Sequence, residues 1–132
     1  MVAYHCDTNA ILIKPFQTRE DRHRIPAYTR IMTRFKTRGH VIYHQVLNNE
    51  ASKEYFRHVT DIWKATYQLV PPDVHCRYIA KRAIRTFKAH FLSILAGIPS
   101  SFPNYLWDKL LPQTDLSLNL LCQSTIAPLT SA

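Results

Sequence analysis

The chain has 132 residues, 46% of them hydrophobic and 20% charged, and its net charge is +8. The length is that of one domain, the apolar fraction excludes a wholly disordered chain, and no apolar run approaches the roughly 20 residues that cross a bilayer. Only two glycines occur, so the glycine-rich phosphate loops of nucleotide-binding enzymes are excluded.

The sequence begins with a predicted β-hairpin. Met1–His5 and Ala10–Ile13 have the composition of short strands. Between them lie Asp7, Thr8 and Asn9, residue types that form turns through hydrogen bonds to their own backbone. We therefore expect the two strands to pair antiparallel.

A helix is predicted at Arg19–Arg38, because apolar residues recur there at i, i+3, i+4 and i+7. The expected signals at its ends are Thr18 as N-cap, Pro26 as a first-turn proline of the regular part, and Gly39 as the C-terminal stop. The apolar stripe consists of Tyr28, Ile31, Met32 and Phe35.

Strands and helices then alternate to the end of the chain. The element order predicts an α/β domain with a mixed sheet over residues 1–124, followed by a linker or tail at 125–132. The remaining elements are predicted as a strand Val41–Leu47, a helix Ala51–Trp63, a strand Tyr67–Val70, a helix Arg77–Ala96 and a helix Tyr105–Leu121 that is kinked or broken at Pro112. The buried face of the Arg77–Ala96 helix is predicted as Ile79, Ala83, Ile84, Phe87, Phe91, Ile94 and Leu95.

Basic residues cluster in two places. Eight lysines and arginines lie between Lys14 and Arg38, against two acids. A second group falls between Asp73 and Asp108, a stretch without any acid. A charged run is often only a solvated face, but a second cluster of the same sign in one small domain favours a polyanionic partner. The second group consists of Arg77, Lys81, Arg82, Arg85 and Lys88, in which Arg82, Arg85 and Lys88 can share one exposed helix side.

Five runs of residues carry a family resemblance: YHCDTNAIL at 4–12, LNNEAS at 47–52, VPPDVH at 70–75, RAIRTFK at 82–88 and LWDKLLPQ at 106–113. In this order and spacing they resemble the integrase catalytic core of LTR retrotransposons, over nearly the whole chain. The resemblance implies an RNase H-like fold. It also implies DNA joining by two divalent metal ions, usually magnesium, which three carboxylates hold.

The acidic triad of the family is not intact in this sequence. The first carboxylate belongs to a strand that precedes Met1 in the family pattern, and Asp7 falls in the hairpin turn that follows that strand. The second and third positions are Asn48 and Lys81. An amide lacks the charge that offsets a metal ion, and an ammonium group repels one. We therefore expect no metal cofactor and no catalytic activity.

The missing first strand is central in an RNase H-like sheet, so its absence leaves either a gap or a new direct pairing of strands. We expect the basic helix residues Arg77, Lys81, Arg82, Arg85 and Lys88 to bind DNA phosphates without sequence preference. No secretory signal is evident and the three cysteines, Cys6, Cys76 and Cys122, are far apart, which is typical of a reducing, intracellular compartment. If the family role is retained, that compartment is the nucleus.

Three other interpretations remain open. The chain could be an active metal enzyme completed by a partner chain or by Asp7, Glu50 and Asp73. It could be a homodimeric assembly module whose surface contains Trp63, Phe102, Tyr105 and Trp107, although such aromatic residues more often form the core. It could also be an untranslated polyprotein remnant without function. Zinc is disfavoured, because the pairs His5-Cys6 and His75-Cys76 lack a second half with ligand spacing.

Overall fold

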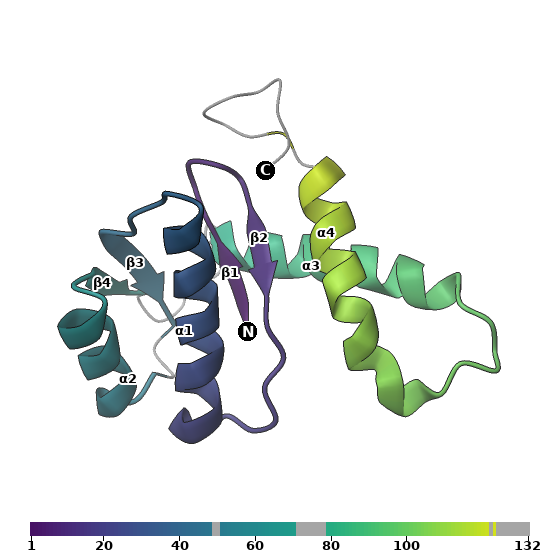
Figure 1. Ribbon diagram of the computed structural model, residues 1–132, viewed down its shortest axis with the longest axis horizontal. Helices are drawn as coiled ribbons and strands as arrows, with labels where there is room; N and C mark the ends of the chain where they lie inside the picture. The colour runs from purple at the N-terminus through teal and green to yellow at the C-terminus, as the bar shows by residue number, and fades with distance from the viewer. Residues whose placement is uncertain (49–50, 71–78, 122, 124–132) are drawn as a thin grey trace. The chain divides into compact units, whose positions relative to one another are not determined.

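The computed structural model describes residues 1–48, 51–70, 79–121 and 123 (Figure 1). The chain has a mixed α/β fold, as predicted, and divides into two compact units. Unit 1 comprises Met1 and residues 16–78, and unit 2 comprises residues 2–15 and 79–132. Each unit has its own cluster of buried hydrophobic residues. The predicted tail at 125–132 lies outside the described residues.

The order of strands and helices is the predicted one. The elements are β1 (Val2–Tyr4), β2 (Ile11–Ile13), α1 (Asp21–Thr37), β3 (His44–Leu47), α2 (Lys53–Arg57), the π-helix η1 (His58–Ile62), β4 (Thr66–Leu69), α3 (Ile79–Ala96), the 3₁₀ helix η2 (Asn104–Leu110) and α4 (Leu111–Leu121).

The strands of the described residues form two separate two-stranded sheets. β1 and β2 pair antiparallel, with Val2 opposite Ile13, as the hairpin prediction required. β3 and β4 pair parallel, with His44 opposite Thr66. The single mixed sheet that the sequence predicted is therefore wrong for the described part of the chain. Each described strand has three or four residues and pairs with one neighbour.

Helix α1 begins two residues later than predicted, and its N-cap is Glu20 rather than Thr18. The carbonyl of Glu20 accepts the first backbone bonds, from His23 and Arg24 at 3.0 Å each. Pro26 lies inside the helix and not at the start of its regular part, so the first-turn prediction was wrong. Gly39 ends the helix in the left-handed conformation, with φ of 82°, as the sequence predicted.

The core of unit 1 forms where α1 packs against α2, η1 and Ala65, the residue before β4. Tyr28 is buried and its ring meets that of Tyr55 edge to face, 5.1 Å between centroids. The Gln45 amide donates a hydrogen bond of 2.6 Å to the Tyr28 hydroxyl. Burial raises the pKa of Tyr28 to about 12, and the weaker opposing effect comes from the Gln45 bond. The residues of this core are Tyr28, Met32, Tyr55, Val59 and Ala65.

The predicted helix Ala51–Trp63 is shorter and irregular. Ser52 is its N-cap, because the Ser52 hydroxyl accepts the backbone N–H of Tyr55 at 3.1 Å and donates to the carboxylate of Asp21. Asp21 also pairs with Arg24 at 2.8 Å, so the starts of α1 and α2 share one polar cluster. Beyond Arg57 the chain continues as the π-helix η1, where the Thr60 hydroxyl donates to main-chain carbonyls of the preceding turn. Nothing in the apolar spacing predicted that change.

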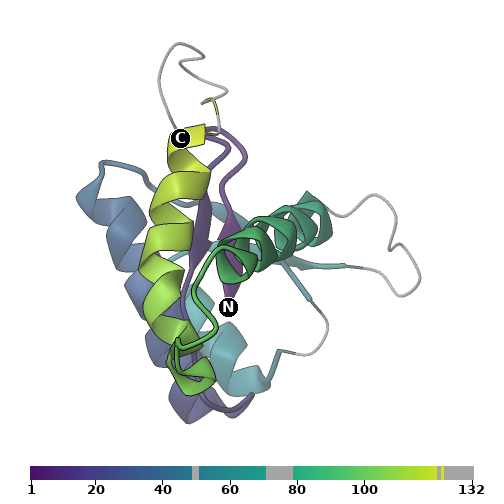
Figure 2. The ribbon, with the colours of Figure 1, turned by 90° about the vertical axis from the view of Figure 1, so that its right-hand side faces the viewer.

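The core of unit 2 lies between the β1–β2 hairpin, α3 and α4, and α4 runs along the hairpin (Figure 2). The predicted buried face of α3 is confirmed for Ala83, while Phe87 and Phe91 are half-buried against the same cluster. Ile79 is 46% exposed, so its predicted burial was wrong, because it is the first residue of the helix. The cluster consists of Ile11, Ile13, Ala83, Leu111 and Leu118.

Asn119 on α4 binds the edge of β2 in the way a neighbouring strand would. Its Oδ1 accepts the backbone N–H of Ile11 at 2.8 Å, and its Nδ2 donates to the Ile11 carbonyl at 2.9 Å. The Asn119 side chain is buried, and Nδ2 also donates to the carbonyl of Asp115 at 2.7 Å. The predicted break at Pro112 is confirmed, since the 3₁₀ helix ends at Leu110 and α4 starts at Leu111, which places the proline in its first turn.

Stability is expected to fall at alkaline pH through Tyr28. The unfolded tyrosine ionises near pH 10 and the folded one near pH 12, so the stabilisation is complete below pH 10 and lost as the pH rises to about 12. Two pKa units correspond to about 3 kcal/mol. Urea titrations from pH 8 to 12 should show this loss in the wild type and a flatter profile in Tyr28→Phe. Tyr105→Phe, at an exposed tyrosine, should keep the wild-type profile.

Replacing Asn119 by alanine should destabilise the chain by about 2–4 kcal/mol, because both backbone groups of Ile11 lose their partner inside a buried site. The midpoint of urea unfolding measures this change. Gln113→Ala, at an exposed amide on the same helix, should change stability by less than about 0.5 kcal/mol. Equal losses of stability in the two variants would show that the hydrogen bonds between the Asn119 amide and Ile11 do not stabilise the fold.

Candidate nucleic-acid interface

The outer side of α3 is basic. Lys81, Arg82, Arg85 and Lys88 are all exposed, while Ala83 on the opposite side is buried. At 100° per residue, Lys81, Arg85 and Lys88 fall within an arc of about 60°, with Arg82 beside them. The fifth predicted contact, Arg77, lies outside the described residues. We name the four described residues the α3 basic face.

The geometry of the α3 basic face suits a polyanion. From Lys81 to Lys88 the helix rises about 10 Å, at 1.5 Å per residue. The helix contains no aspartate or glutamate. Duplex DNA carries a charge about every 1.7 Å along its axis, so this length faces several phosphates.

The two family positions of the acidic triad belong to different units. Asn48 directly follows β3 in unit 1, is exposed, and its carbonyl accepts the backbone N–H of Ala51 at 3.4 Å. Lys81 is the third residue of α3 in unit 2. Because the positions belong to different units, we build no site across them. The rescuing acids that we considered, Glu50 and Asp73, lie outside the described residues.

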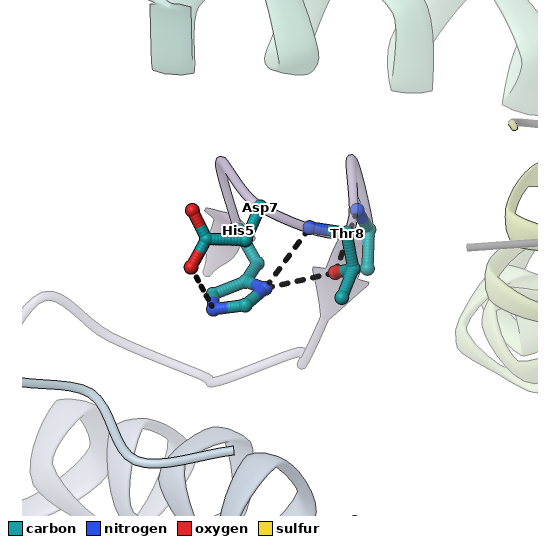
Figure 3. Close-up of polar contacts among 4 residues, drawn as sticks. His5, Asp7 and Thr8 are labelled. Atoms are coloured by element: carbon teal, nitrogen blue, oxygen red, sulfur yellow. Dashed lines mark hydrogen bonds and ion pairs between the residues drawn. The ribbon is translucent and has the colours of Figure 1, made fainter. Parts of the chain in front are cut away.

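Asp7 lies in the turn between β1 and β2, where the sequence pattern placed it (Figure 3). Its carboxylate is 70% exposed and 3.9 Å from Nε2 of His5. The other ring nitrogen of His5 lies 2.8 Å from the Thr8 hydroxyl. Asn9 completes the turn with φ of 62°, and its Oδ1 accepts the Tyr4 hydroxyl at 2.8 Å. Asp7 is thus part of a local polar turn.

The residues at the two family positions do not fit a magnesium site. Magnesium takes oxygen ligands in octahedral geometry, whereas the family positions hold one neutral amide, Asn48, and one ammonium group, Lys81. Among the described residues, no three or more histidine, cysteine, aspartate or glutamate side chains come together as a candidate metal site. Of the two pairs weighed for zinc, His75-Cys76 lies outside that part of the chain.

The four aromatic residues predicted for an assembly surface divide between interior and exterior. Trp63 is half-buried against the unit 1 core, and its indole N–H donates to Nε2 of His58 at 3.3 Å. Phe102 is half-buried. Trp107 is 47% exposed and Tyr105 is 79% exposed, both on η2.

The first basic cluster is partly neutralised and partly exposed. Glu20 pairs with Arg22 at 2.6 Å, and Asp21 pairs with Arg24, so the two acids of this cluster meet arginines at the start of α1. Arg30, Lys36 and Arg38, farther along, are exposed. No acid occurs between Asp21 and Glu50, a second acid-free basic stretch whose exposed residues the sequence did not single out.

A comparison with models of known protein families finds no match to this chain, and a search of curated proteins finds none either. No helix in the described part of the chain is both long and apolar enough to span a membrane.

Proposed function

We propose that the chain is a degenerate, RNase H-like integrase core of the LTR-retrotransposon type that binds DNA without sequence preference and does not catalyse DNA joining. The proposed DNA binding rests on the α3 basic face, which consists of four exposed lysines and arginines on a helix that contains no acid. The order of elements and the five sequence runs support the family assignment. If the family role is retained, the chain acts in the nucleus.

The proposed contact is electrostatic. Lysine and arginine side chains on one helix side replace counterions along the phosphate backbone, and the released ions supply most of the binding free energy. Such contacts position a protein on DNA but carry no sequence information. Lys81 takes part in this contact, at the position where the family holds a metal-binding carboxylate. The same substitution that removes the expected catalysis therefore adds a charge to the binding surface.

The triple variant Arg82→Ala, Arg85→Ala and Lys88→Ala should weaken binding to a duplex oligonucleotide. The slope of log affinity against log salt should fall in magnitude by up to about 2.7, because each lost phosphate contact accounts for about 0.9. Fluorescence anisotropy at several salt concentrations measures both quantities.

The matched control removes three exposed charges elsewhere: Lys53→Ala, Arg57→Ala and Lys109→Ala. It should alter affinity much less, since only the general field of the protein changes. If the two triple variants lose affinity and slope equally, α3 is not the contact surface and net charge alone explains the binding.

A second candidate function, a homodimeric assembly module, has its own observation. Helix α4 contains no lysine or arginine, and its only acid, Asp115, is buried. In a chain of net charge +8, such a surface lets two copies meet without opposing like charges. The exposed apolar residues on α4 and η2 are Tyr105, Trp107, Leu116, Leu120 and Leu121.

Light scattering after gel filtration distinguishes this candidate. A dimer that uses α4 should become monomeric in Leu116→Ser with Leu120→Ser, because the apolar contact is lost. Val41→Ser with Ile62→Ser removes two exposed apolar side chains from unit 1 and should leave the mass unchanged. A wild-type chain that is already monomeric at high concentration would exclude the assembly function.

A further inference from the structure

The ring of His58, the first residue of the π-helix η1, contacts three neighbours in unit 1. Its Nε2 atom lies 3.3 Å from the indole nitrogen of Trp63 and 3.0 Å from the Thr29 hydroxyl. The ring of Tyr28 meets the His58 ring edge to face, with 5.9 Å between centroids. One half-buried nitrogen therefore joins helix α1 to Trp63, the residue that ends η1.

The bonds at Nε2 fix the position of the hydrogen on the neutral ring. An indole N–H can only donate, so Trp63 requires a lone pair on Nε2, and the neutral imidazole carries its hydrogen on Nδ1. The Thr29 hydroxyl can rotate and donate to the same lone pair. Protonation puts a hydrogen on Nε2, which Thr29 can accept but which opposes the N–H of Trp63. The charged ring therefore loses its bond to Trp63.

Two other histidines keep their bonds when they are charged. His90 lies 2.8 Å from the Ser117 hydroxyl, which itself donates to a main-chain carbonyl of its own helix. His44 lies 2.8 Å from the Thr66 hydroxyl, which also donates to a main-chain carbonyl. In both pairs the hydroxyl accepts a hydrogen from the ring, so the protonated ring fits as well as the neutral one. His58 differs because a fixed donor faces its nitrogen.

The backbone around Trp63 has an unusual conformation. η1 is a π-helix, a rare form that often occurs at functional sites. Lys64 follows Trp63 with φ of 53°, in the left-handed region that a lysine seldom adopts. The backbone N–H of Ala65 then donates to the Val59 carbonyl at 3.3 Å. A strained backbone persists only where surrounding contacts hold it, and the bond between His58 and Trp63 is one of these contacts.

Several ionisable groups lie near the His58 ring, but within the described residues none of the acids forms an ion pair with it. From α1, the Tyr28 phenol faces the ring, and burial raises its pKa to about 12, so it stays neutral where histidine titrates. Met1 packs against the same core, and burial lowers the pKa of its amine to about 6. The exposed charged residues on α2 and η1 and directly after them are Glu54, Arg57, Asp61 and Lys64.

We infer that His58 is an acid-sensitive switch: the neutral ring holds Trp63 against the core of unit 1, and the protonated ring releases it. The charge deprives the half-buried indole of its acceptor and puts a cation among aromatic side chains. Histidine is the side chain that ordinarily changes its charge between about pH 5 and pH 8. The inference concerns unit 1 alone, so it stands whether or not the α3 basic face binds DNA.

The test follows the indole N–H signal of Trp63 by NMR in the full chain, with the signal assigned through Trp107→Phe. Acidification from about pH 8 to about pH 5 should move this signal toward the position of a water-exposed indole. The ratio of released to bound Trp63 should rise by about 5- to 150-fold, because one hydrogen bond is lost. In Trp107→Phe, the emission of Trp63 should shift to the red and become more accessible to acrylamide.

Two variants of His58 and a matched control identify the group that titrates. His58→Gln should hold Trp63 throughout the pH range, because an amide oxygen accepts a hydrogen bond without titrating. His58→Phe keeps a ring without an acceptor, so Trp63 should be released even at neutral pH. The control is His90→Gln, at a half-buried histidine of unit 2, which should leave the response of Trp63 unchanged.

The inference is overturned by a Trp63 signal that does not respond to pH while the chain stays folded, or by a response that appears only as the whole chain unfolds. A response that persists in folded His58→Gln would also overturn it and would assign the titration to the Met1 amine. The ¹⁵N shifts of the His58 ring need no variant. They should show the hydrogen on Nδ1 at neutral pH, and a hydrogen on Nε2 would contradict the switch even if His58→Gln does not fold.

Discussion

The side-chain amide of Asn119 engages both backbone groups of Ile11, and it shows the constraint under which this chain folds. Its strands have only three or four residues, so a strand seldom finds a second neighbour to satisfy its outer edge. Side chains supply those bonds instead. In unit 2, Asn119 hydrogen-bonds the outer edge of β2. In unit 1, the Thr66 hydroxyl donates to the Tyr43 carbonyl beside the β3–β4 ladder. Both units depend on polar side chains at the margins of small sheets.

Local signals predicted the elements well and their assembly poorly. The hairpin followed from the turn residues at 7–9, and the end of α1 followed from Gly39, because both depend on local backbone chemistry. The start of α1 was misplaced because Glu20, through its main-chain carbonyl, could act as N-cap without a capping side chain. The separation into two sheets depends on which strands meet, and no local pattern in strands of three or four residues reports that.

In the candidate nucleic-acid interface and elsewhere on the surface too, local spacing predicted some features and missed others. Helical spacing was enough to place Lys81, Arg82, Arg85 and Lys88 on the exposed side of α3, since one buried side leaves the opposite side to solvent. The exposure of Tyr43 could not be predicted from such spacing. In a regular strand from Val41 to Leu47 it would share a face with Gln45, which points inward to Tyr28. The strand begins only at His44, and the irregular backbone before it turns Ile42 into the core and leaves Tyr43 outside.

Charge explains why binding can outlast catalysis in the proposed function. A two-metal site needs several negative charges at one place, so the loss of a single carboxylate removes much of the metal affinity, and a lysine in its position reverses the sign of the local field. Phosphate binding requires positive charges instead, and these can be spread over a surface. Each cation adds a similar increment, and no single one is essential. Under the proposed function, lysine and arginine on α3 would therefore oppose metal binding and strengthen the attraction for nucleic acid.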